Sequence, residues 1–165
     1  MLMQSSTAAL WFALFAAPIA AWVVWSDLKS MRIPNKAVVA LVGVYAVVGV
    51  LALPLPVWGW GWLHLAVALV IGFVLTLSGG FGAGDAKFAA AMAPFVALGD
   101  LRLFLVRRAP VVLPSYLAHG IARRTPQWPP ATPGWESWER SEFPMGLALG
   151  PTLIFYLVLA AIHGS

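Results

Sequence analysis

Long apolar runs separated by short polar segments dominate this chain. Residues 37–84 contain no Asp, Glu, Lys or Arg. A helix needs only about 20 residues to cross a bilayer, so this run must hold more than one span. The stretch LPLPVWGWGW at 53–62 divides it with prolines, glycines and alternating tryptophans, a composition typical of a turn at the membrane surface. The pattern therefore predicts helices over 37–53 and 62–78.

Other apolar runs predict further membrane helices on both sides of this pair. The first covers residues 8–25. No Lys or Arg precedes its apolar core, so we interpret it as a retained helix and not as a secretory signal. A fourth helix is expected at 86–99, beginning just after Asp85, and a last one at 143–162.

The fifth span is harder to place because Arg107 and Arg108 interrupt the apolar pattern. A helix starting at 103 would carry both arginines, whereas one over 109–122 covers only about 21 Å of a hydrocarbon core of about 30 Å. We favour the short helix, with 100–108 at the outer surface. The prediction is an all-α, polytopic integral membrane protein, with residues 1–165 forming one bundle of about six transmembrane helices.

Composition supports a bilayer and narrows the chemistry. The chain is 61% hydrophobic and 10% charged, whereas roughly a quarter of the residues of soluble domains are charged. Its net charge of +4 comes from basic clusters between apolar runs, as in membrane topology signals, so no nucleic-acid partner is expected. Without cysteine there is no disulfide, thiol nucleophile or CxxC pair. The three histidines are isolated, and we expect no metal site and no cofactor.

The distribution of basic residues predicts the orientation. With the N-terminus outside, most of them fall in cytoplasmic segments: Lys29, Arg32, Lys36, Lys87, Arg123, Arg124 and Arg140. The outer side holds Arg102, Arg107 and Arg108. This arrangement follows the positive-inside rule. The cytoplasmic loop 123–142 is expected to be irregular, with Glu136, Glu139 and Glu142 facing solvent.

Two acidic residues are predicted to meet at the cytoplasmic face. Asp27 ends the first helix and Asp85 begins the fourth, and two intervening helices return the chain to the same side. Ionisable groups at membrane depth usually face the bundle interior and serve a function. Two neighbouring carboxyl groups can work as an acid/base pair, one ionised and one holding its proton. Asp100 falls at the opposite face on this topology, so it is not expected to be catalytic.

A glycine-rich segment, SGGFGAGDAKF at 78–88, leads into Asp85. Gly82 and Gly84 lack a Cβ atom and would allow the backbone to bend or another segment to approach closely. On its own the segment has a simpler interpretation, in which Asp85 merely caps the fourth helix. The pairing with Asp27 favours the functional interpretation.

Three motifs carry a family resemblance. GAGDAK (Gly82–Lys87) resembles the GxGD signature of intramembrane aspartyl proteases, and DLKSMRIPN (Asp27–Asn35) resembles the aspartate-containing segment of type IV prepilin peptidases. FPMGLALG (Phe143–Gly150) is similar to the Pro-x-Gly opening of that family's last helix, through Pro144 and Gly146. The motifs occur in the family's order across nearly the whole chain.

The resemblance is closest to the small peptidases of the tight-adherence (Flp) pilus class. It implies Asp27 and Asp85 as the catalytic aspartates, Gly82 and Gly84 as backbone support, and prepilins and pilin-like proteins as substrates. Cleavage would occur at the cytoplasmic face of the bacterial inner membrane, after a glycine. Larger members carry an N-terminal domain with paired CxxC motifs and methylate the new N-terminus. This chain has no cysteine, so methylation is not expected.

Several other residues have two interpretations. Lys29, Arg32 and Lys36 are topology determinants, although a basic patch could also attract an acidic group of the substrate. Lys87 either stabilises the ionised form of the aspartate pair or extends to the interface. Pro34 and Asn35 are expected to end one element and cap the second helix.

Two alternative functions follow from the same residues. A non-enzymatic membrane carrier or pilus-assembly subunit could use paired carboxylates to bind a cation or relay protons. Against it, the acids lie at one face and no inverted repeat is visible. A protease of the presenilin type is disfavoured, since the chain has neither a Pro-Ala-Leu motif before a late helix nor a Tyr-Asp pair; Ser26 precedes Asp27. The sequence does not indicate an oligomeric state.

Overall fold

A computed structural model describes residues 2–79, 81–107, 109–125, 131–140 and 142–164. Over these residues the secondary structure is helical apart from one isolated bridge between Leu2 and Gly164. The helices are α1 (Ser6–Ser30), α2 (Asn35–Ala52), α3 (Leu55–Leu77), α4 (Ala83–Met92), α5 (Leu101–Arg107), α6 (Ala109–Arg124), α8 (Glu136–Glu139) and α9 (Gly146–His163). Two 3₁₀ turns, Ala93–Phe95 and Leu98–Asp100, lie between α4 and α5.

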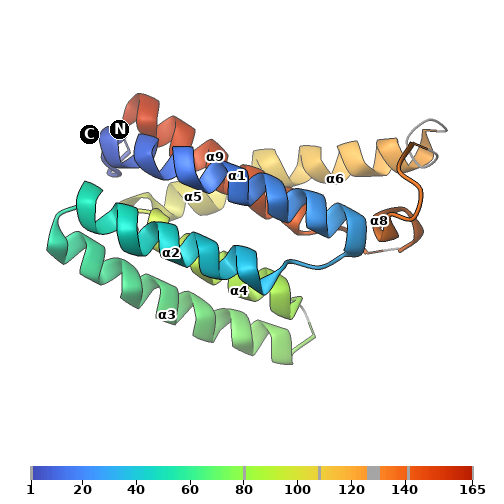
Figure 1. Cartoon of the computed structure of the whole chain (residues 1–165), viewed down its shortest axis with the longest axis horizontal. Helices are drawn as coiled ribbons and strands as arrows, with labels where there is room; N and C mark the ends of the chain where they lie inside the picture. Colours follow the sequence, from blue (N-terminus) through green and yellow to red (C-terminus); the bar gives the residue numbers. More distant parts are fainter. Residues whose placement is uncertain (1, 80, 108, 126–130, 141, 165) are drawn as a thin grey trace.

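Four of the helices are long and apolar enough to cross a membrane: α1, α2, α3 and α9. They run lengthwise along the molecule, with the two chain ends together at one end of it (Figure 1). Helices α1 and α9 lie side by side and form the most extensive helix pair. The all-α, membrane-compatible fold predicted from the apolar pattern is confirmed.

An aromatic cluster joins the first two helices to the turn after α4. Phe12 of α1 contacts Tyr45 of α2 and Phe95, with ring centroids 5.9 and 4.9 Å away. All three side chains are fully buried. Fully buried aromatic side chains contribute more to core energetics than smaller apolar ones. The cluster therefore fixes α1, α2 and the end of α4 relative to one another.

Helix α3 begins seven residues earlier than predicted. The expected turn at 53–62 was wrong, because α3 starts at Leu55 directly after Pro54. Proline is tolerated in the first helical turn, where its missing N–H has no intrahelical partner. Trp58 and Trp62 are therefore one turn apart on a helix, packed edge-to-face with ring centroids 5.8 Å apart.

Helix α4 is shorter than predicted at its far end. It covers Ala83–Met92, and the expected helix 86–99 is replaced after Met92 by 3₁₀ turns. Pro94 lies in the first of these turns, and because proline has no backbone N–H it cannot donate the next hydrogen bond of the helix. Ten helical residues extend only about 15 Å.

The later helices start close to the predicted positions. Helix α6 begins at Ala109, as expected for the short fifth helix, and the preceding segment forms the separate helix α5. Helix α9 begins at Gly146, three residues after the expected start. The expected irregular loop contains one helical turn, α8. Arg108 lies outside the described residues.

Candidate functional site

Asp27 lies in the last turn of α1 and is 4% exposed. The helix ends after Ser30 because Met31 has a positive φ of 50°, and its N–H bonds back to the carbonyl of Asp27. The Asp27 side chain points into the bundle, where its Oδ2 accepts a 2.7 Å hydrogen bond from the backbone N–H of Gly146. The carboxyl group is therefore held by the start of α9, a segment 119 residues away in sequence.

Gly146 fits this position because it has no side chain. A Cβ atom there would lie 2.9 Å from Asp27 Cβ, 3.0 Å from Asp27 Oδ2 and 3.1 Å from Val23 Cγ1. Such contacts are closer than ordinary van der Waals packing. A larger residue would thus push α9 away from α1 at the carboxyl group itself.

Asp85 lies in the first turn of α4, three residues after the N-cap residue Gly82. Its carboxyl group accepts a hydrogen bond from the backbone N–H of Gly82. A side chain at the third helical position that bonds back to the N-cap N–H is half of a capping box. A Cβ on Gly82 would come 2.5 Å from Asp85 Oδ2, so a glycine is needed for this geometry.

Gly84 lets α4 approach the segment after α1. Its nearest neighbour is Ile33, whose Cβ would lie 3.5 Å from a Cβ on Gly84. Ile33 belongs to the RIPN segment and is buried. On the other side of α4, Ala86 packs against Gly72 of α3, where a Cβ would lie 3.0 Å from Ala86 Cβ. These small residues set the position of Asp85 between α3 and the α1–α2 connection.

The two aspartates are electrostatic neighbours. Asp85 precedes the expected span 86–99 and belongs to none of the four long apolar helices. Burial raises the pKa of Asp85 to about 6, and the negative charge of Asp27 also raises it, against a smaller lowering by the Gly82 N–H. An acid beside a second carboxylate keeps its proton longer. The two residues that the sequence pattern paired are thus close enough for the charge of one to act on the other.

The other predicted site residues lie around this pair in different settings. Lys29 Nζ lies 4.9 Å from the centre of the Trp25 ring, and Arg32 is exposed. Lys87 is exposed, and its Nζ lies 3.5 Å from Asn35 Oδ1. Pro144 is fully buried just before α9.

The expectation that Asn35 caps the second helix was wrong. Asn35 is the first residue of α2, and Pro34 occupies the N-cap position with no side-chain cap bond. The Asn35 side chain instead accepts from Lys87. This bond joins α2 to α4. Among the contacts of the described residues, Lys87 is therefore bonded to Asn35 and not to the carboxyl group of Asp27 or Asp85.

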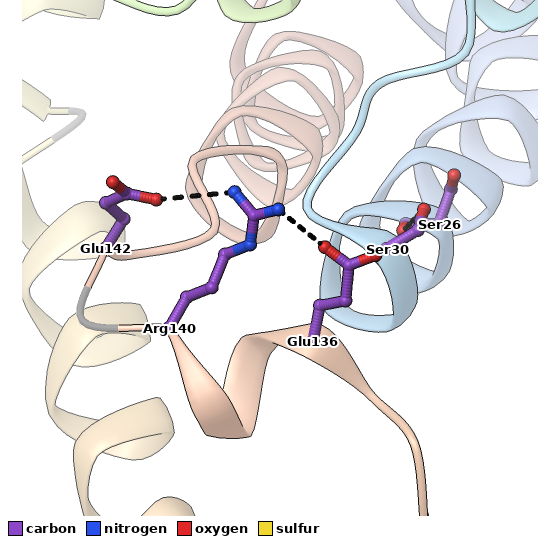
Figure 2. Close-up of polar contacts among 5 residues, drawn as sticks. All are labelled: Ser26, Ser30, Glu136, Arg140 and Glu142. Atoms are coloured by element: carbon purple, nitrogen blue, oxygen red, sulfur yellow. Dashed lines mark hydrogen bonds and ion pairs between the residues drawn. The ribbon is translucent and has the colours of Figure 1, made fainter.

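A charged loop lies at the same end of the molecule, beside the end of α1. Arg140 bridges Glu136 at 3.0 Å and Glu142 at 3.8 Å, and Figure 2 shows this group next to Ser26 and Ser30 of α1. The three charged side chains are 40–72% exposed, so the ion pairs contribute little to stability. The predicted solvent-facing acidic loop therefore adjoins the helix that carries Asp27.

Stacked rings hold this loop on α6. His119 stacks on Trp138 with a centroid distance of 5.2 Å and meets Phe143 edge-on at 5.9 Å. Trp138 also donates a 2.8 Å hydrogen bond to Thr132. Sequence reasoning missed this contact, because His119 and Trp138 lie in unrelated segments with no common motif.

Asp100 lies at the far end of α1 and has a structural setting. It is 1% exposed and accepts hydrogen bonds from the backbone N–H groups of Met3 and Gln4, at 2.8–3.1 Å, and from the Tyr156 hydroxyl at 2.9 Å. At 1.5 Å per residue, the helix separates it from Asp27 by roughly 30 Å. No group of three or more potential metal ligands occurs among the described residues.

Comparison with known proteins identifies the family. The type IV leader peptidase family matches residues 10–121, a range that contains both Asp27 and Asp85 and covers more than half of the chain. No curated protein and no solved structure gives a significant match. The apolar helices make this a membrane protein, and the family is one of peptidases. The chain therefore belongs to the type IV leader peptidase family.

Proposed function

We propose that the chain is a membrane-embedded aspartic endopeptidase that removes the leader peptide of Flp-type prepilins and pilin-like proteins, with Asp27 and Asp85 as its catalytic pair. The observation that carries this proposal is the packing of the start of α4 against the segment that follows Asp27, where Gly84 lies next to Ile33. In this arrangement the charge of Asp27 raises the pKa of Asp85. The acids come from two helices, the last turn of α1 and the first turn of α4. Membership of a peptidase family supports the same reading.

The chemistry of such a pair is acid/base catalysis on water. One carboxylate removes a proton from a water molecule, whose oxygen attacks the scissile carbonyl carbon, while the other carboxylic acid gives its proton to the carbonyl oxygen. No metal or organic cofactor is required by this scheme. Asp27 is nearly excluded from solvent, and burial strengthens the electrostatic interactions within the pair.

We further propose that the reaction takes place at the cytoplasmic face of the bacterial inner membrane, with the N-terminus outside. The basic residues at the Asp27 end include Lys29, Arg32 and Lys36, which follow α1, and Lys87 beside Asp85. Arg123 and Arg124 close α6 at this end as well. An excess of Lys and Arg marks the cytoplasmic side of a membrane protein.

The test is cleavage of a co-expressed Flp-type prepilin by the wild type, Asp27→Asn and Asp85→Asn, with membrane levels matched. Each substitution is expected to remove nearly all processing, because paired catalytic groups act as one unit. Asp100→Asn is the control, since it removes an equally buried carboxylate about 30 Å away. Near-normal processing by either Asp27→Asn or Asp85→Asn would show that the pair is not catalytic.

If the wild type does not process the Flp-type prepilin, the proposed substrate is wrong. Flp-type and other type IV prepilins are therefore supplied in parallel, together with a prepilin whose glycine before the cleavage site is replaced. Cleavage of the intact prepilins but not of the replaced one supports a leader peptidase. If the wild type cleaves neither the Flp-type prepilin nor the other type IV prepilins, the result contradicts the proposal.

A further inference from the structure

We propose that His119 is a positioning residue of the aspartate pair. Its ring holds Phe143 on α6, and Phe143 fixes the start of α9, which binds the carboxyl group of Asp27. The inference rests on the proposed peptidase function and deepens it by adding a residue that lies in none of the three motifs. His119 acts through the backbone of α9 and not on a peptide, since its side chain is only 7% exposed.

Two rings of α6 hold Phe143. His119 meets the Phe143 ring edge-on with centroids 5.9 Å apart, and Tyr116 meets it at a tilt with centroids 5.4 Å apart. Tyr116 and His119 are three residues apart in α6, so their side chains lie on the same face of the helix. Phe143 is therefore attached to one face of α6 by two aromatic contacts.

The face of the His119 ring carries the α8 turn as well. His119 and Trp138 stack with centroids 5.2 Å apart and an angle of 8° between their planes, and Trp135 stacks on Trp138 at 6.2 Å. Offset stacks and edge contacts are the favoured geometries of aromatic pairs. His119 is thus the ring shared by the α8 turn and Phe143, and its removal breaks both contacts at once.

Phe143 passes this constraint to α9 over a short stretch of chain. Only Pro144 and Met145 separate it from Gly146, and Pro144 is fully buried. The N–H of Leu147 donates to the Pro144 carbonyl at 3.1 Å, so the first turn of α9 is attached to the buried proline. A shift of Phe143 therefore moves the backbone that carries the Gly146 N–H.

This N–H is the group that holds Asp27. It donates to Asp27 Oδ2 at 2.7 Å in a buried setting. Helix α6 packs mainly against α9, so its influence on the carboxyl group runs through the start of that helix. The loop has a second attachment, because α8 packs against α1 and lies next to Ser26 and Ser30 (Figure 2).

The polar atoms of His119 do not explain its place in this arrangement. Its Nε2 is buried and has no hydrogen-bond partner among the residues that the structure describes. The contacts that hold the loop are therefore those of the ring. Phenylalanine at this position keeps a planar ring and removes the nitrogen, whereas alanine removes the ring itself.

The first test compares the cleavage kinetics of His119→Ala and His119→Phe in detergent. We expect His119→Ala to lower kcat by up to roughly 10²-fold with KM within a few-fold of the wild type, because small displacements of a catalytic group have effects of this size. His119→Phe should restore kcat to within a few-fold of the wild type. Equal losses in the two variants, a loss confined to KM, or an unchanged kcat in His119→Ala would each overturn the proposal.

A matched pair of phenylalanines keeps the test decisive if His119→Ala does not fold. Phe104 makes one edge contact, with Tyr156 at 5.5 Å, at the opposite end of the bundle. We expect Phe143→Ala to lower kcat, and Phe104→Ala to lower thermal stability while kcat per folded molecule is kept. The same kcat loss in both variants would show a general effect of stability and would overturn the positioning role.

Amide hydrogen exchange gives a readout that does not need cleavage. The Gly146 amide is bonded to Asp27, so loss of this bond should speed its exchange. Mass spectrometry of peptides covering 143–150 should show faster exchange in His119→Ala and in the reference variant Asp27→Ala. His119→Phe and Phe104→Ala should exchange like the wild type. Unchanged exchange in His119→Ala would overturn the proposal whatever the kinetics show.

The two readouts separate this inference from the function on which it rests. If the wild type cleaves no prepilin but exchange is faster in His119→Ala, the contact through α9 is supported and the peptidase proposal is wrong. If Asp27→Asn abolishes cleavage but exchange is unchanged in His119→Ala, the peptidase proposal is supported and His119 has no positioning role.

Discussion

Tyr156 of α9 donates a 2.9 Å hydrogen bond to Asp100 at the end of the bundle opposite to Asp27. The same hydroxyl accepts a bond from the Ala97 N–H at 3.2 Å. Asp100 also receives the backbone N–H groups of Met3 and Gln4. One buried carboxylate thus joins the segment before α1, the turn before α5 and the helix α9.

Asp100→Asn should destabilise the protein and leave its chemistry intact. Asparagine has one acceptor oxygen and a donor NH₂ group where Asp100 receives three donors, and each bond lost to a charged group costs about 1.5–3 kcal/mol. Thermal unfolding in detergent should show a clear fall in Tm, while the cleavage rate per folded molecule stays within a few-fold of the wild type.

Tyr156→Phe is the matched variant, because it removes one donor and keeps the ring packed on Phe104 at 5.5 Å. Its loss should be smaller than that of Asp100→Asn. The two losses should not add in the double variant, since the residues share a bond. Additive losses would show that the hydroxyl and the carboxylate act independently.

The pH dependence of cleavage should report Asp85. Its pKa is raised to about 6, and the proposed mechanism needs its proton, so kcat/KM should fall as the pH rises above about 6, by up to tenfold per pH unit. The profile is measured with a peptide substrate that has no groups titrating in this range. A kcat/KM that keeps rising from pH 6 to 8 would contradict an acid role for Asp85.

Gly61→Ala should destabilise α3 through Tyr45. A Cβ on Gly61 would collide with the Tyr45 hydroxyl and lie 2.5 Å from its Cζ, while Tyr45 is fully buried and bonded to the Trp58 carbonyl. Forcing extra volume into a packed site typically costs 1–3 kcal/mol. Gly59→Ala, with no atom within 4 Å, should be neutral or stabilising. Unfolding in detergent compares the two variants.

Cysteine labelling can test the orientation, because the chain contains no cysteine of its own. Leu98, which is 68% exposed near Asp100, and the exposed Glu139 of α8 lie at opposite ends of the bundle. In intact cells an impermeant maleimide should label Leu98→Cys but not Glu139→Cys until the membrane is permeabilised. The opposite pattern would reverse the proposed topology, and the cysteine-free wild type gives the background.

The apolar pattern predicted most of the fold because it reflects burial in lipid more than local geometry. The start of α3 was missed, since Pro54 and the following glycines suggest a turn although proline suits a helix start equally well. The early end of α4 depends on Pro94, whose effect varies with its surroundings.

The sequence could predict the acidic side chains of the candidate site, but not the backbone groups and helix contacts that hold them in place. Chain direction alone placed Asp27 and Asp85 at one end, and in the structure the charge of Asp27 acts on Asp85. The group that donates to Asp27 is the backbone N–H of Gly146, and almost every residue has such a group. The sequence signal at this position is therefore only the glycine itself, whose lack of a side chain makes room for Asp27. The contact of Gly84 with Ile33 joins two motifs whose spacing in the fold depends on α2 and α3.

The two acids are carried by helices that pack against different partners. Asp27 belongs to the tight α1–α9 pair, whereas α4, which carries Asp85, packs mainly against α3. A small sliding movement of α3 and α4 along α1 would change the separation of the carboxyl groups while the bond from Gly146 to Asp27 stays in place. The position of Asp27 therefore depends on the packing of α9, and the position of Asp85 depends mainly on the packing of α3.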